Sequence, residues 1–430
     1  MVEAPTGFQA KPDGGECGMR AVIAKSGLAF LDQAILSGTN FAVAIILMKT
    51  AGKEQYGYYS IAFAMSLFLV SLQNAVVTTP LAVLLAGKEG EAKDVYAGAL
   101  YWGQIIAVVP VSLLGLAVTG ILHFSGLGTT QISTISALCF AGIGILLREF
   151  SRAYHFARQS TSTVLLLDLT FAAGYFVLLG VCYPAGITAP VAFVLMGVSS
   201  ILSSVVFKEA RWKCDWAAIR ESYQENWAFA KWSLTGVMVS HLQSYCNLYL
   251  TGTLIGTAAA GSLSASRLPM SPLALLQTGW NKVAVPRGAH LRERRQLRQF
   301  FKEQVFATVV VGIGVVAYVG VLWMLADVLK RLLFNKGYEG SLELIWFWAA
   351  INIVGFTALS ASIGLQVIKE FGTIVKNSSV TMLITLASTV ILIGRYGIQG
   401  GLAASLLGDS VLAASLWWCL AKRYFMEVPL

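Results

Sequence analysis

Long apolar runs recur along the sequence, separated by short connections rich in glycine, proline and charged residues. A helix needs about 20 mostly apolar residues to cross the hydrocarbon of a bilayer. Twelve runs reach that length, and none alternates apolar and polar positions as a half-buried strand does. The pattern predicts an all-α polytopic membrane protein with twelve spans, near 27–49, 57–86, 96–122, 129–150, 161–183, 187–207, 229–255, 258–284, 304–333, 342–366, 372–394 and 397–421.

The composition agrees with a membrane protein and argues against several other classes. Hydrophobic residues make up 56% of the chain and charged residues 12%, with a mean hydropathy of +0.69. A soluble domain carries about 25% charged residues. The cysteines are scattered without a Cys-x-x-Cys pair, so we expect no disulfide framework and no metal site. The sequence also lacks a catalytic triad and a phosphate-binding glycine loop, and we expect no enzymatic activity and no cofactor.

The basic residues indicate the orientation of the chain in the membrane. With the N-terminus placed in the cytoplasm, the inner connections and tails carry 24 Lys and Arg, and the outer connections carry six. Such a bias marks the cytoplasmic side of a membrane protein. We therefore expect both termini in the cytoplasm and the chain in the cell inner membrane. The bias also accounts for the net charge of +9, so we expect no nucleic-acid partner.

The two halves of the sequence are related by a repeat. Gly57-x-x-Ser60 followed by Leu72-Gln73 in span two matches Gly261-x-x-Ser264 followed by Leu276-Gln277 in span eight, all at one offset of 204 residues. A duplicated unit of six spans keeps its orientation, so two lobes are expected to pack about a pseudo-two-fold axis along the membrane normal. The predicted parts are a cytoplasmic tail, the first lobe, a linker, the second lobe and a second tail: 1–26, 27–207, 208–228, 229–421 and 422–430.

The linker carries an apolar stripe at helical spacing. Its members, at steps of three and four residues, are Trp212, Trp216, Ile219, Tyr223 and Trp227. This pattern predicts an amphipathic helix in the inner membrane interface, with its Trp side chains at the level of the headgroups. An ordinary connecting segment is the alternative.

Several spans carry polar side chains, which are costly in hydrocarbon unless they face a cavity or a partner. Spans one and seven, the first helices of the two repeats, each present a polar stripe that includes Gln33 and Asn40, and Ser244 and Asn247, respectively. We expect both stripes to line one water-filled cleft between the lobes. The alternative is polar contact between packed helices.

Span eight carries Arg267 about ten residues from its outer end, which is roughly 15 Å deep at 1.5 Å per residue. Pro269 and Pro272 are expected to interrupt the helix just beyond it. A guanidinium at this depth suits an anion, particularly a phosphate. The alternative is a structural ion pair with one of three acids, which could instead bind a coupling cation, Na+ or H+: Asp32, Asp168 and Asp409.

The predicted binding residues combine basic groups with neutral groups suited to sugar hydroxyls. They are Arg267, Lys231, Lys282, Gln33, Asn40, Gln73, Asn74, Ser244, Asn247 and Gln277.

The segment from Leu31 to Gly57 resembles the opening of a known family. Its first helix carries Asn40 and leads to a Gly-x-x-x-Tyr-Gly turn made by Gly52, Tyr56 and Gly57. This is similar to the Wzx-type lipid-linked oligosaccharide flippases of the multidrug/oligosaccharidyl-lipid/polysaccharide (MOP) exporter superfamily. The resemblance implies two six-helix lobes around a cationic cavity, alternating access, and an undecaprenyl-diphosphate-linked sugar unit as substrate. The family uses membrane-embedded Arg or Lys in that cavity, and Arg267 is the candidate here.

Two other function classes stay open at this stage. A cation-coupled multidrug exporter of the same superfamily would use an acid in span one, such as Asp32. A membrane glycosyltransferase or polysaccharide polymerase is disfavoured because the outer connections are short and leave no room for an extracellular domain. We expect a monomer that contacts membrane lipids and its lipid-linked glycan, with a polysaccharide polymerase and chain-length machinery as further partners.

Overall fold

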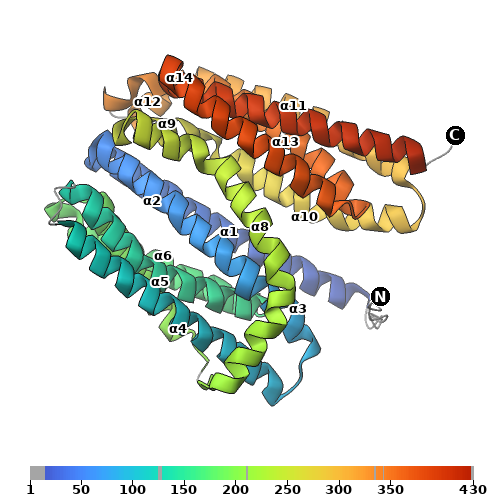
Figure 1. Ribbon diagram of the computed structural model, residues 1–430, viewed down its shortest axis with the longest axis horizontal. Coiled ribbons are helices and arrows are strands. Elements are labelled where there is room, and N and C mark those ends of the chain that lie inside the picture. The colour runs from blue at the N-terminus through green and yellow to red at the C-terminus, as the bar shows by residue number, and fades with distance from the viewer. Residues whose placement is uncertain (1–14, 124–127, 210–211, 334–335, 342, 428–430) are drawn as a thin grey trace.

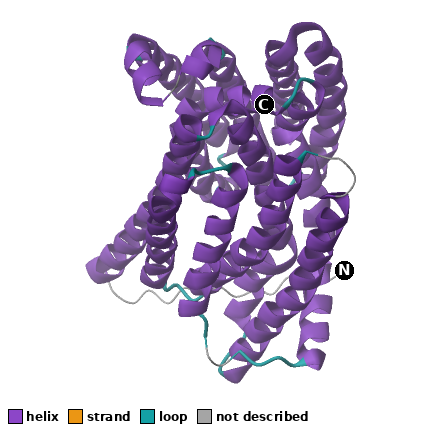
Figure 2. Cartoon of the chain, turned by 90° about the vertical axis from the view of Figure 1, so that its left-hand side faces the viewer, coloured by secondary structure: helices purple, strands orange, loops and turns teal. Residues whose placement is uncertain are grey.

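The computed structural model describes residues 15–123, 128–209, 212–333, 336–341 and 343–427; the ends of both predicted tails lie outside these ranges. Within them the chain forms helices joined by short loops, with no strand, as expected for an all-α protein (Figure 2). The first half contains α1 (Gly15–Thr50), α2 (Gly52–Gln73), η1 (Asn74–Thr78), α3 (Thr79–Leu84), η2 (Leu85–Gly87), α4 (Glu91–Leu122), α5 (Thr129–Ala157), α6 (Thr161–Cys182), η4 (Tyr183–Ala185) and α7 (Ala189–Val206).

The second half begins with α8 (Trp216–Leu254), which runs between the two helical bundles that Figure 1 shows in blue to teal and in yellow to red. The remaining elements are α9 (Thr257–Arg267), η5 (Leu268–Met270), α10 (Ser271–Glu293), α11 (Leu297–Met324), α12 (Ala326–Leu333), η6 (Lys336–Ser341), α13 (Ile345–Val367) and α14 (Phe371–Glu427). We call the bundle of α1–α7 the N-lobe and the bundle of α8–α14 the C-lobe.

Nine helices in the described part of the chain are long and apolar enough to cross a membrane. The segment Phe371–Arg423 of α14 counts once among them, although the chain turns at Gly397, where φ is +60° and ψ is −139°. The more polar α8 and the α9–α10 pair fall outside the nine. The chain is a multi-pass membrane protein, and the count of twelve spans stays a prediction.

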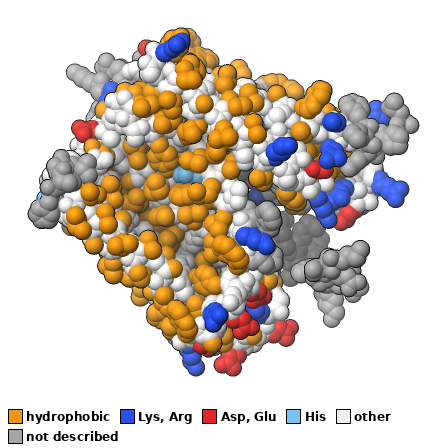
Figure 3. Space-filling model, viewed as in Figure 1, with side chains coloured by type: hydrophobic (Ala, Val, Ile, Leu, Met, Phe, Trp, Pro, Cys, Tyr) orange, Lys and Arg blue, Asp and Glu red, His pale blue; other side chains and the backbone are white. Residues whose placement is uncertain are grey.

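The outer surface of the helices explains why a bilayer is needed. Large apolar side chains such as Val111, Ile121 and Trp418 are about 70% exposed. In Figure 3 apolar side chains cover most of the visible face of both lobes, and charged side chains gather near its edges. Hydrocarbon is the solvent that removes the cost of exposing such a surface.

Two repeat-related glycines bring the lobes together. A Cβ placed on Gly57 of α2 would collide with the carbonyl oxygen of Thr257, and one placed on Gly261 of α9 would collide with that of Lys53. The offset of 204 relates Gly57 to Gly261 and also Lys53 to Thr257. The contact is therefore two-fold symmetric, and its closeness depends on the absence of side chains at both glycines.

The same end of the molecule holds a second contact between the lobes. Tyr338 of η6 is almost fully buried and packs edge-on against Tyr56 of α2, with ring centroids 6.4 Å apart. The ammonium of Lys53 lies 5.6 Å from the centre of the Tyr338 ring. The lobes are thus closed against each other at the end where α2 and α9 begin.

The predicted linker helix and span seven form one helix, α8, in the structure. Trp212 and Ile219 are buried against the N-lobe, where the Trp102 indole donates to the Trp212 carbonyl oxygen at 3.1 Å. Trp216 and Trp227 are exposed. Part of the apolar stripe therefore packs on the N-lobe, and the rest is exposed. The predicted amphipathic helix would instead lie free in the membrane interface, without packing on either lobe.

Candidate functional site

The N-lobe contains a buried ionic cluster centred on Arg152 of α5. Its guanidinium donates from Nε to Asp168 Oδ2 of α6 at 2.7 Å, from Nη1 to Glu149 Oε2 at 2.7 Å, and from Nη2 to Asp32 Oδ2 of α1 at 3.1 Å. Asp32 and Asp168 are 0% exposed. A buried charge is stable only beside a partner of opposite sign. Here one guanidinium pairs with carboxylates from three helices, α1, α5 and α6.

Arg148 extends the cluster by one helical turn. It donates from Nη2 to Glu149 Oε1 at 3.0 Å, and its guanidinium lies 3.8 Å from the centre of the Phe171 ring. With every group ionised, the cluster holds three carboxylates and two guanidinium groups, a surplus of one negative charge. Oδ1 of Asp32 and of Asp168 each lack a hydrogen-bond partner among the described residues.

These positions correct two expectations from the sequence. The 24 basic residues counted in the inner connections and tails include Arg148 and Arg152, but both lie within α5, where their side chains are largely buried. The partner of Asp32 and Asp168 is Arg152, whereas the alternative interpretation of Arg267 paired it with Asp32, Asp168 or Asp409. The physical reason is the packing of α1, α5 and α6, which places the three side chains together inside one lobe.

Arg267 lies in the C-lobe as the last residue of α9, where the chain enters the proline-containing turn η5. The predicted interruption of the helix at Pro269 is therefore confirmed. The Arg267 side chain is exposed, and its guanidinium carbon lies 5.7 Å from the centre of the Tyr245 ring and 5.4 Å from that of Trp348. Among the described residues, no carboxylate lies within 4.0 Å of this guanidinium.

Further contacts fix the two rings that hold Arg267. The Trp348 indole donates to Ser266 Oγ at 2.9 Å, and Tyr245 stacks on His241 with ring centroids 4.8 Å apart. The His241 ring also lies 4.6 Å from that of Phe68 on α2, which connects this aromatic group to the N-lobe. Cation–π contacts attract a guanidinium without using its N–H groups, so those of Arg267 stay available for another acceptor.

Comparisons with known proteins bear on this arrangement. No family model matches the sequence, and a search of curated proteins finds no significant relative. Among solved structures, an inward-facing multidrug resistance MATE family transporter of the MOP superfamily aligns with a TM-score of 0.72 at 13% identity, over 90% of this chain and 93% of that one. The lipid II flippase MurJ, in an inward closed conformation, aligns with a TM-score of 0.70 at 15% identity, over 93% and 87%. The chain has the fold that these two proteins share.

A third structure of this fold is a MOP superfamily transporter from Pyrococcus furiosus, described by the reversed polarity of its binding pocket. It aligns with a TM-score of 0.62 at 12% identity, over 95% of this chain and 96% of that one. Identities this low establish the fold and not the substrate.

Within this fold, two of the predicted neutral residues belong to the interior of a lobe. Gln73 is buried and donates to Gln104 Oε1 at 2.8 Å and to the Leu146 carbonyl oxygen at 2.7 Å. Asn247 is buried and accepts from the Thr251 hydroxyl at 3.2 Å. The Gln73 side chain thus joins α2 to α4 and α5, whereas the Asn247 hydrogen bond lies within α8.

The other predicted residues are more accessible, and no hydrogen bond joins any two of them in the described part of the chain. Asn74, Ser244, Lys231 and Lys282 are exposed, whereas Gln33, Asn40 and Gln277 are half-buried. Gln277 donates to Asn352 Oδ1 at 3.5 Å. Of the predicted binding residues, Arg267 has the most clearly defined surroundings, because the rings of Tyr245 and Trp348 lie close to its guanidinium.

Proposed function

We propose that the chain is a transporter that moves an undecaprenyl-diphosphate-linked oligosaccharide across the cell inner membrane by alternating access, for exopolysaccharide or O-antigen assembly. The fold supports transport, since the similar structures are MOP superfamily transporters and one is titled a lipid II flippase. The resemblance of residues 31–57 to Wzx-type flippases supports the substrate class.

The observation that carries the anionic substrate is that Arg152 of the N-lobe is paired with acids, whereas Arg267 of the C-lobe is not paired with one in the described part of the chain. In the N-lobe, Arg152 already binds Asp32 and Asp168, so these acids are not available to a cationic drug. In the C-lobe, Arg267 is exposed, held by rings, and without a carboxylate within 4.0 Å among the described residues. An uncompensated guanidinium favours an anion.

The chemistry of the substrate fits this division. The lipid tail stays in the bilayer, and the protein shelters the diphosphate and the sugars as they cross about 30 Å of hydrocarbon. Arg267 would meet the diphosphate with the bidentate geometry of its guanidinium. Lys282 and Lys231 would add positive charge nearer the inner mouth.

The coupling ion is assigned to the N-lobe. The surplus negative charge of the cluster favours binding of a coupling cation, Na+ or H+, at Asp32 and Asp168, whose Oδ1 atoms have no hydrogen-bond partner among the described residues. Asp32→Asn should then abolish coupled transport while leaving substrate affinity intact. A cation-coupled multidrug exporter is the second candidate, because similar structures are titled multidrug transporters.

The deciding measurement is the affinity of the purified protein for undecaprenyl diphosphate and, in parallel, for tetraphenylphosphonium. Hydrogen bonds to a charged group are worth about 1.5–3 kcal/mol, which corresponds to roughly tenfold to hundredfold in affinity. Arg267→Ala should weaken diphosphate binding by that factor, and Arg267→Lys should retain part of it.

Arg395→Ala is the matched control, because Arg395 is also exposed but lies beside the turn of α14. It should bind the diphosphate as the wild type does. Equal affinities of wild type and a folded Arg267→Ala variant would reject the role of Arg267. Binding of the cation alone would favour the multidrug exporter.

A further inference from the structure

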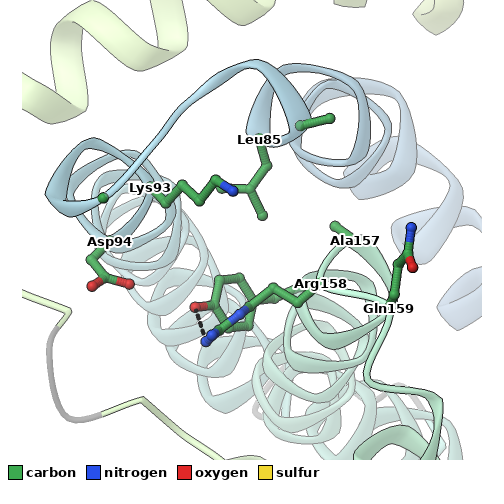
Figure 4. A pocket seen from close by; sticks show the side chains of 9 residues that line it. Leu85, Lys93, Asp94, Ala157, Arg158 and Gln159 are labelled. Atoms are coloured by element: carbon green, nitrogen blue, oxygen red, sulfur yellow. Dashed lines mark hydrogen bonds between the residues drawn. The ribbon is translucent and has the colours of Figure 1, made fainter. Parts of the chain in front are cut away.

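A cavity of about 480 Å³ lies at the end of the N-lobe, away from Arg267. Its walls come from η2, from the first turn of α4 and from the last turn of α5 with the residues that follow (Figure 4). The volume falls within the range of about 300–1,000 Å³ that is usual for small-ligand sites. The lining includes both basic and apolar side chains, among them Lys93, Arg158 and Leu85.

Two cations reach into this cavity from different helices. Lys93 extends from α4 and Arg158 from the end of α5, and Figure 4 shows both side chains directed into the hollow. Within the described residues, the ammonium of Lys93 has no hydrogen-bond or ion-pair partner. Lys93 therefore brings an uncompensated positive charge to the cavity.

Arg158 is anchored on one side only. Its Nη1 donates to the Tyr154 hydroxyl at 3.0 Å and to Glu209 Oε1 at 3.1 Å. A guanidinium carries five N–H donors, so those on Nε and Nη2 are left, in the described part of the chain, for an acceptor in the cavity. Asp94 also lines the wall, and the lining as a whole carries two cations and one carboxylate.

The cavity is situated at the boundary between the lipid-facing and water-facing surfaces. Each of its three walls carries an exposed, large apolar side chain within two residues of the lining: Val83, Val95 and Phe156. The walls belong to connections that the distribution of basic residues assigns to the cytoplasmic side. Basic pockets at that level bind anionic lipid headgroups.

We infer that this cavity binds the phosphodiester headgroup of an anionic phospholipid from the adjoining leaflet, with Lys93 and Arg158 as the cationic partners of the phosphate. The site is separate from the proposed transport site and does not depend on the proposed function. A free phosphate has the same charge, but it has no acyl chains to contact the exposed apolar side chains beside the cavity, Val83, Val95 and Phe156.

The test titrates the full-length protein in a neutral detergent with dioctanoyl phosphatidylglycerol, dioctanoyl phosphatidylcholine and inorganic phosphate, and follows bound species by native mass spectrometry. Near a membrane surface each Lys or Arg contributes about 1 kcal/mol to anionic lipid binding, or about fivefold in affinity. The wild type should prefer phosphatidylglycerol to phosphatidylcholine by at least about tenfold. The Lys93→Gln/Arg158→Gln double variant should lose this preference.

Lys88→Gln is the matched control, since Lys88 lies in the same connection but outside the cavity and pairs with Glu225 at 3.2 Å. It should keep the preference. Tyr154→Phe, which removes the anchor of Arg158 and keeps the ring, should weaken it partially. An undiminished preference in the double variant would overturn the site, and binding of phosphate as tight as that of the lipid would overturn the lipid as its ligand.

Discussion

The contact between Gly57 and Gly261 offers a direct test of alternating access, which is part of the proposed function. In Gly57→Ala the new Cβ would lie 2.6 Å from the Thr257 carbonyl carbon and closer still to its oxygen. Ordinary contacts begin at 3.4 Å, so α2 and α9 would have to separate by at least the difference, about 0.8 Å. Both colliding atoms belong to the backbone and cannot turn away as a side chain would.

Overpacking of this kind costs about 1–3 kcal/mol. The cost applies to the state in which the lobes touch at this end, and it is absent once they separate. The ratio of open to closed molecules should therefore rise by about fivefold to 150-fold, since each 1.4 kcal/mol is a factor of ten. Gly261→Ala should act in the same direction, because the repeat places it in the equivalent contact.

The assay is a double electron–electron resonance measurement between spin labels at Thr129 and Arg395, in a background from which the native cysteines have been removed. Thr129 starts α5 in the N-lobe and Arg395 lies beside the turn of α14 in the C-lobe, and both are exposed. Gly57→Ala should increase the population with the longer distance.

The control for this experiment is Gly312→Ala, because a Cβ at Gly312 of α11 meets no atom within 4 Å. It should leave the distance distribution unchanged. If folded Gly57→Ala and Gly261→Ala variants both give the wild-type distribution, the glycine contact does not control closure, and the reasoning is refuted.

Two further predictions concern the N-lobe cluster and the topology. Arg152→Gln leaves Asp32 and Asp168 buried without their cation, which should lower the free energy of unfolding by about 3–5 kcal/mol; thermal unfolding in detergent measures this, and a Tm equal to that of the wild type would contradict it. Cysteine at Thr129 should react with an impermeant thiol reagent added outside intact cells, and cysteine at Gln296 only after the membrane is opened; the reverse labelling pattern would refute the orientation.

Much of the fold could be predicted because its determinants are local. An apolar run longer than a bilayer is thick can adopt few structures in the membrane. Pro269 also marks the place where α9 ends at Arg267, although Pro110 and Pro286 lie inside the continuous helices α4 and α10. The continuity of α8 is a tertiary effect. Residues 216–228 stay in line with the following span because Ile219 packs on the N-lobe, and the sequence pattern alone does not contain that contact.

The candidate site was harder to predict because its charges come from distant spans. Asp32 and Asp168 each stand within an apolar run and therefore require a cation, but their sequence does not say which one. Counting basic residues by connection assigned Arg148 and Arg152 to the cytoplasm, although both lie within α5. Their spacing of one helical turn, with Glu149 between them, is the signal that could have placed them inside the helix.

The two kinds of contact found here suggest where the molecule moves. Arg152 ties α1, α5 and α6 together through ion pairs of 2.7–3.1 Å, and breaking any of them would leave a buried charge unpaired, at a cost of several kcal/mol. The lobes, by contrast, meet at Gly57 and Gly261 through backbone atoms in van der Waals contact, which leave no unpaired charge when they part. The N-lobe is therefore held together by its ion pairs, and the glycine contact can open without breaking an ion pair. Arg267 also lacks an ion pair among the described residues, because two aromatic rings hold its guanidinium instead. An anion can engage this guanidinium without first breaking a salt bridge.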